Sequence, residues 1–171
     1  AAEQARQAII VDVDSYAKNI NADDEKLMKL WEGLGYYSRV RNLQKAARVI
    51  MTEYDGVFPS DYKAMLSLPG IGEYTAGAIG SVCFDLPEPA VDGNVLRIIS
   101  RITENYNNIL SPVMKKEITQ ILRNIYPSGE LAYLFNQSMM ELGATVCVPN
   151  VAPKCYICPV QQICMAYANH T

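Results

Sequence analysis

Four closely spaced cysteines are the residues of this 171-residue chain best suited to do chemistry. Cys147, Cys155, Cys158 and Cys164 form a Cys-x7-Cys-x2-Cys-x5-Cys array, and the only histidine, His170, lies outside it. Thiolates are soft, strongly donating ligands, so four that converge suit a tetrahedral zinc ion or an iron-sulfur cluster. Two disulfides are a third possibility, which is disfavoured because no secretory signal pattern precedes the array. The array predicts a metal centre whose identity the spacing leaves open.

A turn with two glycines is the second feature. The run Leu68-Pro69-Gly70-Ile71-Gly72 is expected to join a short helix over residues 61–67 to a helix that begins near Tyr74. Glycines at this spacing permit positive φ and leave backbone N–H groups bare at a helix N-terminus, where an anionic oxygen is favoured. The run therefore predicts a phosphate-binding hairpin, with a helix-turn-helix connector of no binding function as the alternative.

A second glycine turn, over residues 33–37, directly precedes a basic stretch. Tyr36 and Tyr37 follow its glycines, and Arg39 and Arg41 come next. An exposed tyrosine can wedge into a base stack while arginines contact the nucleic-acid backbone. The alternatives are tyrosines packed beneath the turn and a solvated helix face.

One aspartate lies at the start of another expected helix. Asp92 and Asn94 occur in the run Val91-Asp92-Gly93-Asn94, which opens an apolar helical pattern. Helix capping is the commonest role of such residues, and catalysis by the Asp92 carboxylate is the alternative.

The elements that must position these residues are all helical. Apolar residues recur at helical spacing almost throughout, and no segment sustains the alternation of a half-buried strand. The expected inward faces are Leu27, Leu30, Trp31 and Leu34; Val95, Ile98, Ile99 and Ile102; Ile118, Ile121, Leu122 and Ile125; and Leu131, Leu134, Phe135, Met139 and Leu142. Ser111 is expected to cap the third of these helices with Pro112 at its first position. The predicted fold class is all-α, with an irregular C-terminal cysteine loop.

Composition limits the function classes. Half of the residues are apolar and no apolar run approaches the length of a membrane span, which predicts a protein of the reducing cytosol rather than a membrane protein. The net charge of −3 argues against binding nucleic acid by bulk electrostatics but leaves local basic faces possible. Cys83 stands apart from the array and is expected to be a buried thiol.

Together these motifs resemble the helix-hairpin-helix DNA glycosylases, and within them the adenine DNA glycosylase branch (MutY type). The runs that carry the resemblance span residues 30–39, 68–79, 91–95 and 135–144. It covers nearly everything from about Asp24 to Cys164, although family members commonly have six residues between the first two cysteines where this chain has seven.

The resemblance implies a function and a set of roles. It implies a 4Fe-4S cluster on the four cysteines, a hairpin in which Leu68, Gly70 and Gly72 hold DNA, and an Asp92 that supports an oxocarbenium-like sugar beside Tyr74 and Asn94. The implied partner is double-stranded DNA with adenine opposite 8-oxoguanine or guanine, bound by a monomer in a bacterial, nucleoid-associated cytoplasm. Endonuclease III-like relatives place a lysine at the position of Tyr74, because Schiff-base chemistry needs an amine, so a lyase is the disfavoured alternative.

The resemblance also implies what lies outside the matched residues. In the family, a helix with an adenine-protonating glutamate precedes the segment where this chain begins, and a domain that recognises 8-oxoguanine follows the cluster. The chain is thus expected to be a catalytic core with reduced activity, or a non-catalytic DNA-binding iron-sulfur module. Its expected parts are a helical segment over residues 1–25, a lobe with the hairpin over 26–128, and a helix with the cluster loop over 129–171.

Overall fold

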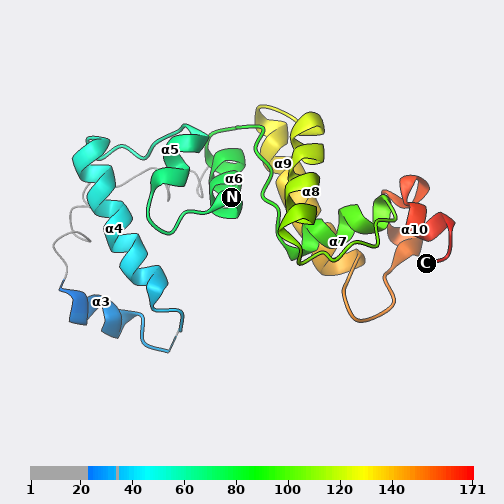
Figure 1. The fold of residues 1–171 in the computed structure, drawn as a ribbon, viewed down its shortest axis with the longest axis horizontal. Helices are drawn as coiled ribbons and strands as arrows, with labels where there is room; N and C mark the ends of the chain where they lie inside the picture. The colour runs from blue at the N-terminus through cyan, green and yellow to red at the C-terminus, as the bar shows by residue number, and fades with distance from the viewer. Residues whose placement is uncertain (1–22, 34) are drawn as a thin grey trace. The chain divides into compact units, whose positions relative to one another are not determined.

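The computed structural model describes residues 23–33 and 35–171 as helices joined by short turns (Figure 1). No strand occurs in these ranges, and the all-α prediction is confirmed. The α-helices are α3 (Asp24–Leu30), α4 (Ser38–Glu53), α5 (Tyr62–Ser67), α6 (Glu73–Cys83), α7 (Gly93–Ile102), α8 (Pro112–Ile125), α9 (Glu130–Glu141) and α10 (Met165–Ala168). A π-helix, η1 (Leu142–Val146), and two 3-10 helices, η2 (Cys155–Ile157) and η3 (Gln161–Ile163), complete the set.

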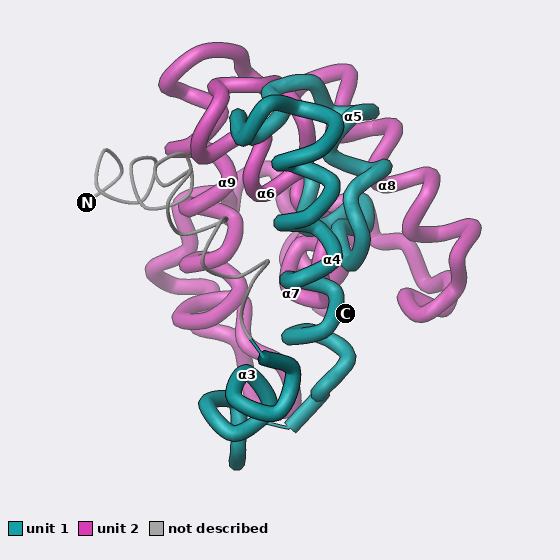
Figure 2. The backbone as a smooth tube through the Cα atoms, turned by 90° about the vertical axis from the view of Figure 1, so that its left-hand side faces the viewer, with its two compact units in different colours: residues 1–76 teal, residues 77–171 magenta. Residues whose placement is uncertain are grey.

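The chain divides into two compact units, Ala1–Ala76 and Gly77–Thr171, and the division falls inside α6 (Figure 2). The expected boundaries after residues 25 and 128 stay predictions, and the expected first segment lies almost wholly outside the described residues. Among the helices that the structure describes, none is both long and apolar enough to cross a membrane.

In the first unit, local side-chain caps set the helix starts. The Asp23 carboxylate accepts a hydrogen bond from the Glu25 N–H (3.1 Å), and the Asp61 carboxylate accepts one from the Ala64 N–H (3.0 Å). Each satisfies a donor that the helix itself leaves free. The expectation that Leu30 faces inward is wrong, because its side chain is 75% exposed. Leu34 lies outside the described residues.

In the second unit, α7 is the central helix. It contacts α8, α9, η1 and α10. The core is formed by Val91, Val95, Leu96, Ile99, Met114, Ile118 and Leu122, with Ile109, Tyr126, Phe135, Met139 and Met140 packed against it. Cys83, also in this unit, is buried as expected.

Part of the predicted apolar faces of α8 and α9 is wrong. Ile121, Ile125, Leu131 and Leu134 are all exposed. On α8 the buried row instead follows Met114, Ile118 and Leu122, at intervals of four residues. When the apolar stripe of a helix is wider than the surface that packs against it, the residues at the margin of the stripe stay exposed to solvent.

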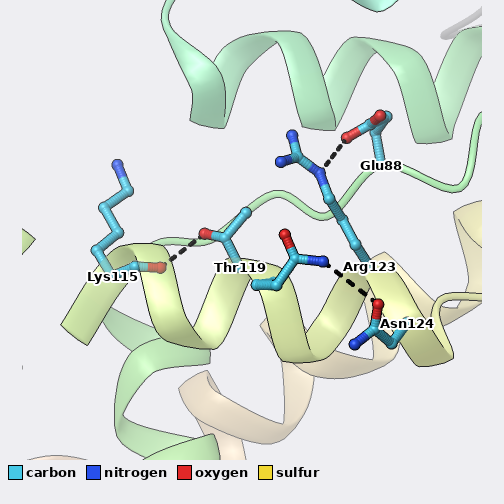
Figure 3. Close-up of polar contacts among 6 residues, drawn as sticks. Glu88, Lys115, Thr119, Arg123 and Asn124 are labelled. Atoms are coloured by element: carbon cyan, nitrogen blue, oxygen red, sulfur yellow. Dashed lines mark hydrogen bonds and ion pairs between the residues drawn. The ribbon is translucent and has the colours of Figure 1, made fainter. Parts of the chain in front are cut away.

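The segment that leads into α7 is fastened to α8. The Arg123 Nε donates to the Glu88 carboxylate at 3.0 Å (Figure 3). The Gly129 N–H donates to the Asp85 carbonyl at 3.2 Å. Both contacts fix the approach of the chain to Asp92, the residue that begins α7.

Candidate functional site

Asp92 is the N-cap of α7, and both of its carboxylate oxygens accept hydrogen bonds. Oδ1 accepts a hydrogen bond from the Val95 N–H at 2.9 Å, and Oδ2 accepts one from the Asn94 side-chain amide, also at 2.9 Å. Asp92 is therefore the N-cap that sequence allowed, with Asn94 as its orienting partner. Two donors hold the carboxylate in one orientation at the positive end of the α7 dipole.

Arg97 connects this cap to the cysteine loop, and the sequence did not single it out. Its Nη2 donates to the Asn94 Oδ1 at 2.9 Å and to the Gly143 carbonyl at 2.8 Å, while its Nε donates to the Cys147 carbonyl at 2.9 Å. A continuous chain of hydrogen bonds thus runs from the Asp92 carboxylate through Asn94 and Arg97 to the backbone of Cys147. The sequence feature that could have pointed to Arg97 is its basic side chain among the apolar positions of α7.

Because Gly143 has no side chain, the backbone of the cysteine-loop side can lie close to Asn94. Gly143 lies in η1, the π-helix that follows α9, and a Cβ on it would come within 2.6 Å of the Asn94 Cβ. π-helical turns are uncommon and occur often at functional sites. Here the wider turn presents the Gly143 carbonyl to Arg97 and ends at Cys147, whose N–H donates to the Leu142 carbonyl at 2.7 Å.

Arg101, one turn after Arg97, holds the first cysteine by its sulfur. Its Nη1 donates to the Cys147 Sγ at 3.2 Å and to the Val148 carbonyl at 3.1 Å. The Cys164 Sγ lies 3.6 Å from the Arg101 carbonyl, to which the thiol donates. The first and last cysteines of the array, Cys147 and Cys164, are therefore both hydrogen-bonded to Arg101 of α7.

The four cysteines share the wall of one cavity of about 220 Å³. Arg101 and residues of α10 contribute to the same wall. All five cysteines of the chain are free thiols, so the disulfide alternative is not found. Burial raises the pKa of the Cys155 thiol, and the neighbouring Cys158, Cys164 and Cys147 thiols add to this rise. In the described ranges no group of three or more histidine, cysteine or acidic side chains is placed to hold a single metal ion.

Short 3-10 turns arrange the last three cysteines. Cys155 begins η2 and Cys158 directly follows it, while Cys164 lies between η3 and α10. The Gln161 side-chain amide donates to the Cys155 carbonyl at 2.9 Å. The proline-bearing loop is thus ordered by its own backbone and by Gln161.

The hairpin of the first unit has the features of a type II turn. The Ile71 N–H donates to the Leu68 carbonyl at 3.1 Å, with Pro69 and Gly70 as the central residues. Gly70 adopts φ +82°, which that position requires. Gly72 has no positive φ, contrary to expectation, and a Cβ there would meet nothing within 4 Å. The Leu68 side chain is buried, so only its backbone is available to a ligand.

The α6 helix begins directly after this turn. Its first backbone hydrogen bond runs from the Ala76 N–H to the Gly72 carbonyl at 2.8 Å, so the N–H groups of its first turn have no partner within the helix. Tyr74 lies in that turn with its side chain 42% exposed. Tyr74 belongs to the first unit and Asp92 to the second.

The other glycine turn presents a tyrosine to solvent. Tyr36 is 75% exposed and has φ +49°, a conformation uncommon for a residue with a bulky side chain. The Arg39 guanidinium lies 4.9 Å from the centre of the Tyr36 ring. The Trp31 indole N–H donates to the Gly35 carbonyl at 2.9 Å and braces the turn. Tyr36 is therefore exposed beside Arg39, and the role of both residues in DNA binding stays a prediction.

Comparisons with known proteins show the family to which the chain is similar. Residues 2–127 match the model of the HhH-GPD superfamily base excision DNA repair proteins. The chain is 40% identical over 152 residues to an adenine DNA glycosylase of Buchnera aphidicola, an alignment that covers 87% of this chain and 42% of that relative. The chain spans less than half the length of the curated relatives it matches.

Two solved structures are similar in fold to this chain. A thermostable thymine-DNA glycosylase superposes with a TM-score of 0.77 at 28% identity, over 90% of this chain and 70% of that one. A non-covalent endonuclease III–DNA complex superposes with a TM-score of 0.75 at 27% identity, over 91% of this chain and 70% of that one.

Proposed function

The chain belongs to the HhH-GPD superfamily of base excision DNA repair proteins, and from this premise we propose that it is the core of a monofunctional adenine DNA glycosylase. Its proposed substrate is double-stranded DNA with adenine opposite 8-oxoguanine or guanine. The observation that carries the proposal is the Asp92 carboxylate, which Val95 and Asn94 orient at the N-terminus of α7. The names of its curated relatives support the choice of adenine.

The proposed reaction is a hydrolysis. The bond between adenine and the sugar C1′ breaks, adenine leaves with the bonding electrons and takes up a proton, and water adds to C1′. A fixed carboxylate at Asp92 stabilises the positive charge that develops on the sugar. Asn94 keeps that carboxylate oriented, and Tyr74 is proposed to stand beside the sugar. Because a phenol at position 74 supplies no amine, no imine with the sugar forms there.

DNA binding is proposed to use both glycine turns of the first unit. Extruding a base costs a few kcal/mol, which Tyr36 or Tyr37 would offset by filling the gap. The exposure of Tyr36 and its contact with Arg39 support this role. The backbone of the Leu68–Gly72 hairpin would bind a phosphate, since its N–H groups lie at the start of α6. Arg39 and Arg41 would contact the strand nearby.

The four cysteines are proposed to hold a 4Fe-4S cluster. The donor set fits, because four thiols face one cavity, and Arg101 provides a positive charge beside it. When bound, the cluster would supply four iron–thiolate bonds that cross-link the loop over residues 147–164. Purified protein should then be brown, absorb broadly near 400 nm and contain about four irons per chain. Folded, colourless protein that holds one zinc would contradict this part of the proposal.

A second candidate is a DNA-binding module without excision activity. The observation that favours it is that both Asp92 oxygens already accept hydrogen bonds within the chain, one from the Val95 N–H and one from the Asn94 side chain. In either case we propose that the protein is a monomer associated with the nucleoid in the bacterial cytoplasm.

Single-turnover adenine release separates the two candidates. The substrate is a duplex with adenine opposite 8-oxoguanine, and the Asp92→Asn variant is the control, since it keeps the shape of the cap but removes the charge. We expect slow release by the parent chain and none by the variant, with DNA binding by both. Binding without release by the parent would favour the non-catalytic module. Equal release by both would refute the role of Asp92.

A further inference from the structure

A row of basic side chains runs along the exposed side of α4. Arg41, Lys45 and Arg48 follow one another at intervals of four and three residues, which places them on one face of the helix. All three are exposed, whereas Val40, Gln44, Ala47 and Ile50 on other faces are buried. In the described part of the chain none of the three forms an ion pair. The row is thus a local basic surface on a chain whose net charge is −3.

The three members of the row do not have the same surroundings. Arg41 lines a cavity of about 190 Å³ together with Asp24 and Glu25 of α3, whose carboxylates offset part of its charge. Lys45 and Arg48 lie about one and two turns further along α4 and do not line this cavity. Lys45 and Arg48 are therefore the two members of the row that lie away from this acidic pair.

The glycine hairpin touches α4 next to Lys45. A Cβ on Gly70 would come within 2.6 Å of the Asn42 Cβ, so the turn lies directly on this residue of α4. Lys45 is three positions after Asn42, and side chains at that spacing are neighbours on a helix, with Cβ atoms about 5–6 Å apart. Arg48 is the next member of the row, one turn further from the hairpin.

We infer that Lys45 and Arg48 extend the hairpin's phosphate site into a track for successive phosphates of one DNA strand. The inference rests on the proposed function, because it concerns the DNA that the hairpin would hold. The row from Arg41 to Arg48 is roughly 10 Å long, and phosphates of one strand follow every ~3.4 Å of the duplex axis. Contacts of this kind position the DNA without reading its sequence.

Salt dependence of binding to an undamaged duplex tests the track. Each phosphate contact contributes about 0.9 to the slope of log K against log salt, so losing one should make the loss of affinity between about 50 and 200 mM NaCl about 3.5-fold smaller. We expect this change for Lys45→Gln and for Arg48→Gln, with about twice the change in slope for the double variant. Lys116→Gln is the matched control, because it removes one charge from an exposed position of α8. Glutamine is about as good a helix former as lysine or arginine, and circular dichroism checks that each variant folds.

The outcomes separate the track from the proposed function. If the parent chain binds DNA with a steep salt dependence and both α4 variants keep its slope, the track is refuted and the proposed function stands. If Lys116→Gln lowers the slope as much as the α4 variants do, only net charge matters and the track is again refuted. If the parent chain binds no duplex at low salt, both the track and the proposed function are overturned.

Discussion

Replacing Arg97 by methionine tests whether this arginine joins the start of α7 to the cysteine loop. Methionine is also long and unbranched, but it has no hydrogen-bond donor. The substitution leaves three acceptors without their donor, namely the Asn94 Oδ1 and the carbonyls of Gly143 and Cys147. The change therefore removes the connection between Asp92 and the loop without creating a large cavity.

The expected loss of stability follows from the three hydrogen bonds. A buried acceptor that loses its donor costs about 1–3 kcal/mol. The Arg97 contacts are partly buried, so water reaches some of these groups and the lower end applies, which gives a total of about 3 kcal/mol. In a chain of this size 1 kcal/mol shifts the melting temperature by about 2–4 °C, so Arg97→Met should lower it by about 6–12 °C.

Thermal unfolding by circular dichroism measures this shift, and Arg123→Met is the matched control. The control removes the same charge, but its ion pair with Glu88 is solvent-accessible, with side-chain exposures of 36% and 23%. Such pairs contribute about 0–1 kcal/mol. Equal shifts for the two variants would refute the reasoning, because the Arg97 contacts would then be no stronger than a surface pair.

Three further substitutions test the glycine hairpin and the buried Tyr126. Gly70→Ala should cost about 1–2 kcal/mol from its φ of +82°, with an added clash against Asn42, whereas Gly72→Ala should change the urea midpoint little; equal effects would contradict the turn geometry. Burial raises the pKa of Tyr126 to about 12, and its buried hydroxyl lies near Ser81 and the Ala90 backbone without hydrogen-bond geometry to either. Because the unfolded state loses this proton first, stability should fall as pH rises from about 10 towards 12. Tyr126→Phe should remove this pH-dependent loss of stability. The urea midpoint of the variant should therefore drop less than that of the parent chain between pH about 9 and 11, and an equal drop would refute the reasoning.

Helix positions and caps were predictable because they depend on near neighbours. Pro112 starts α8 as expected, because proline fits the first helical turn. Ser111 occupies the expected N-cap position, but its side chain makes no capping hydrogen bond. Likewise Asp92 accepts a hydrogen bond from an N–H only three residues away. The buried faces of the helices were predicted less well. An apolar stripe in the sequence does not show which of its two edges packs against another helix. Ile121 and Leu134 are examples of apolar residues that remain exposed.

By itself the sequence determined the helices, the two glycine turns, the cap at Asp92 and the close spacing of the four cysteines, since each depends on residue type and short spacing. Only the tertiary structure decided that Arg97 and Arg101 attach Cys147 to α7, because these contacts join residues 46 to 50 positions apart. A long-range hydrogen bond forms only where packing of α7, α9 and η1 brings donor and acceptor together. That packing is a property of the folded unit and not of any short stretch of sequence.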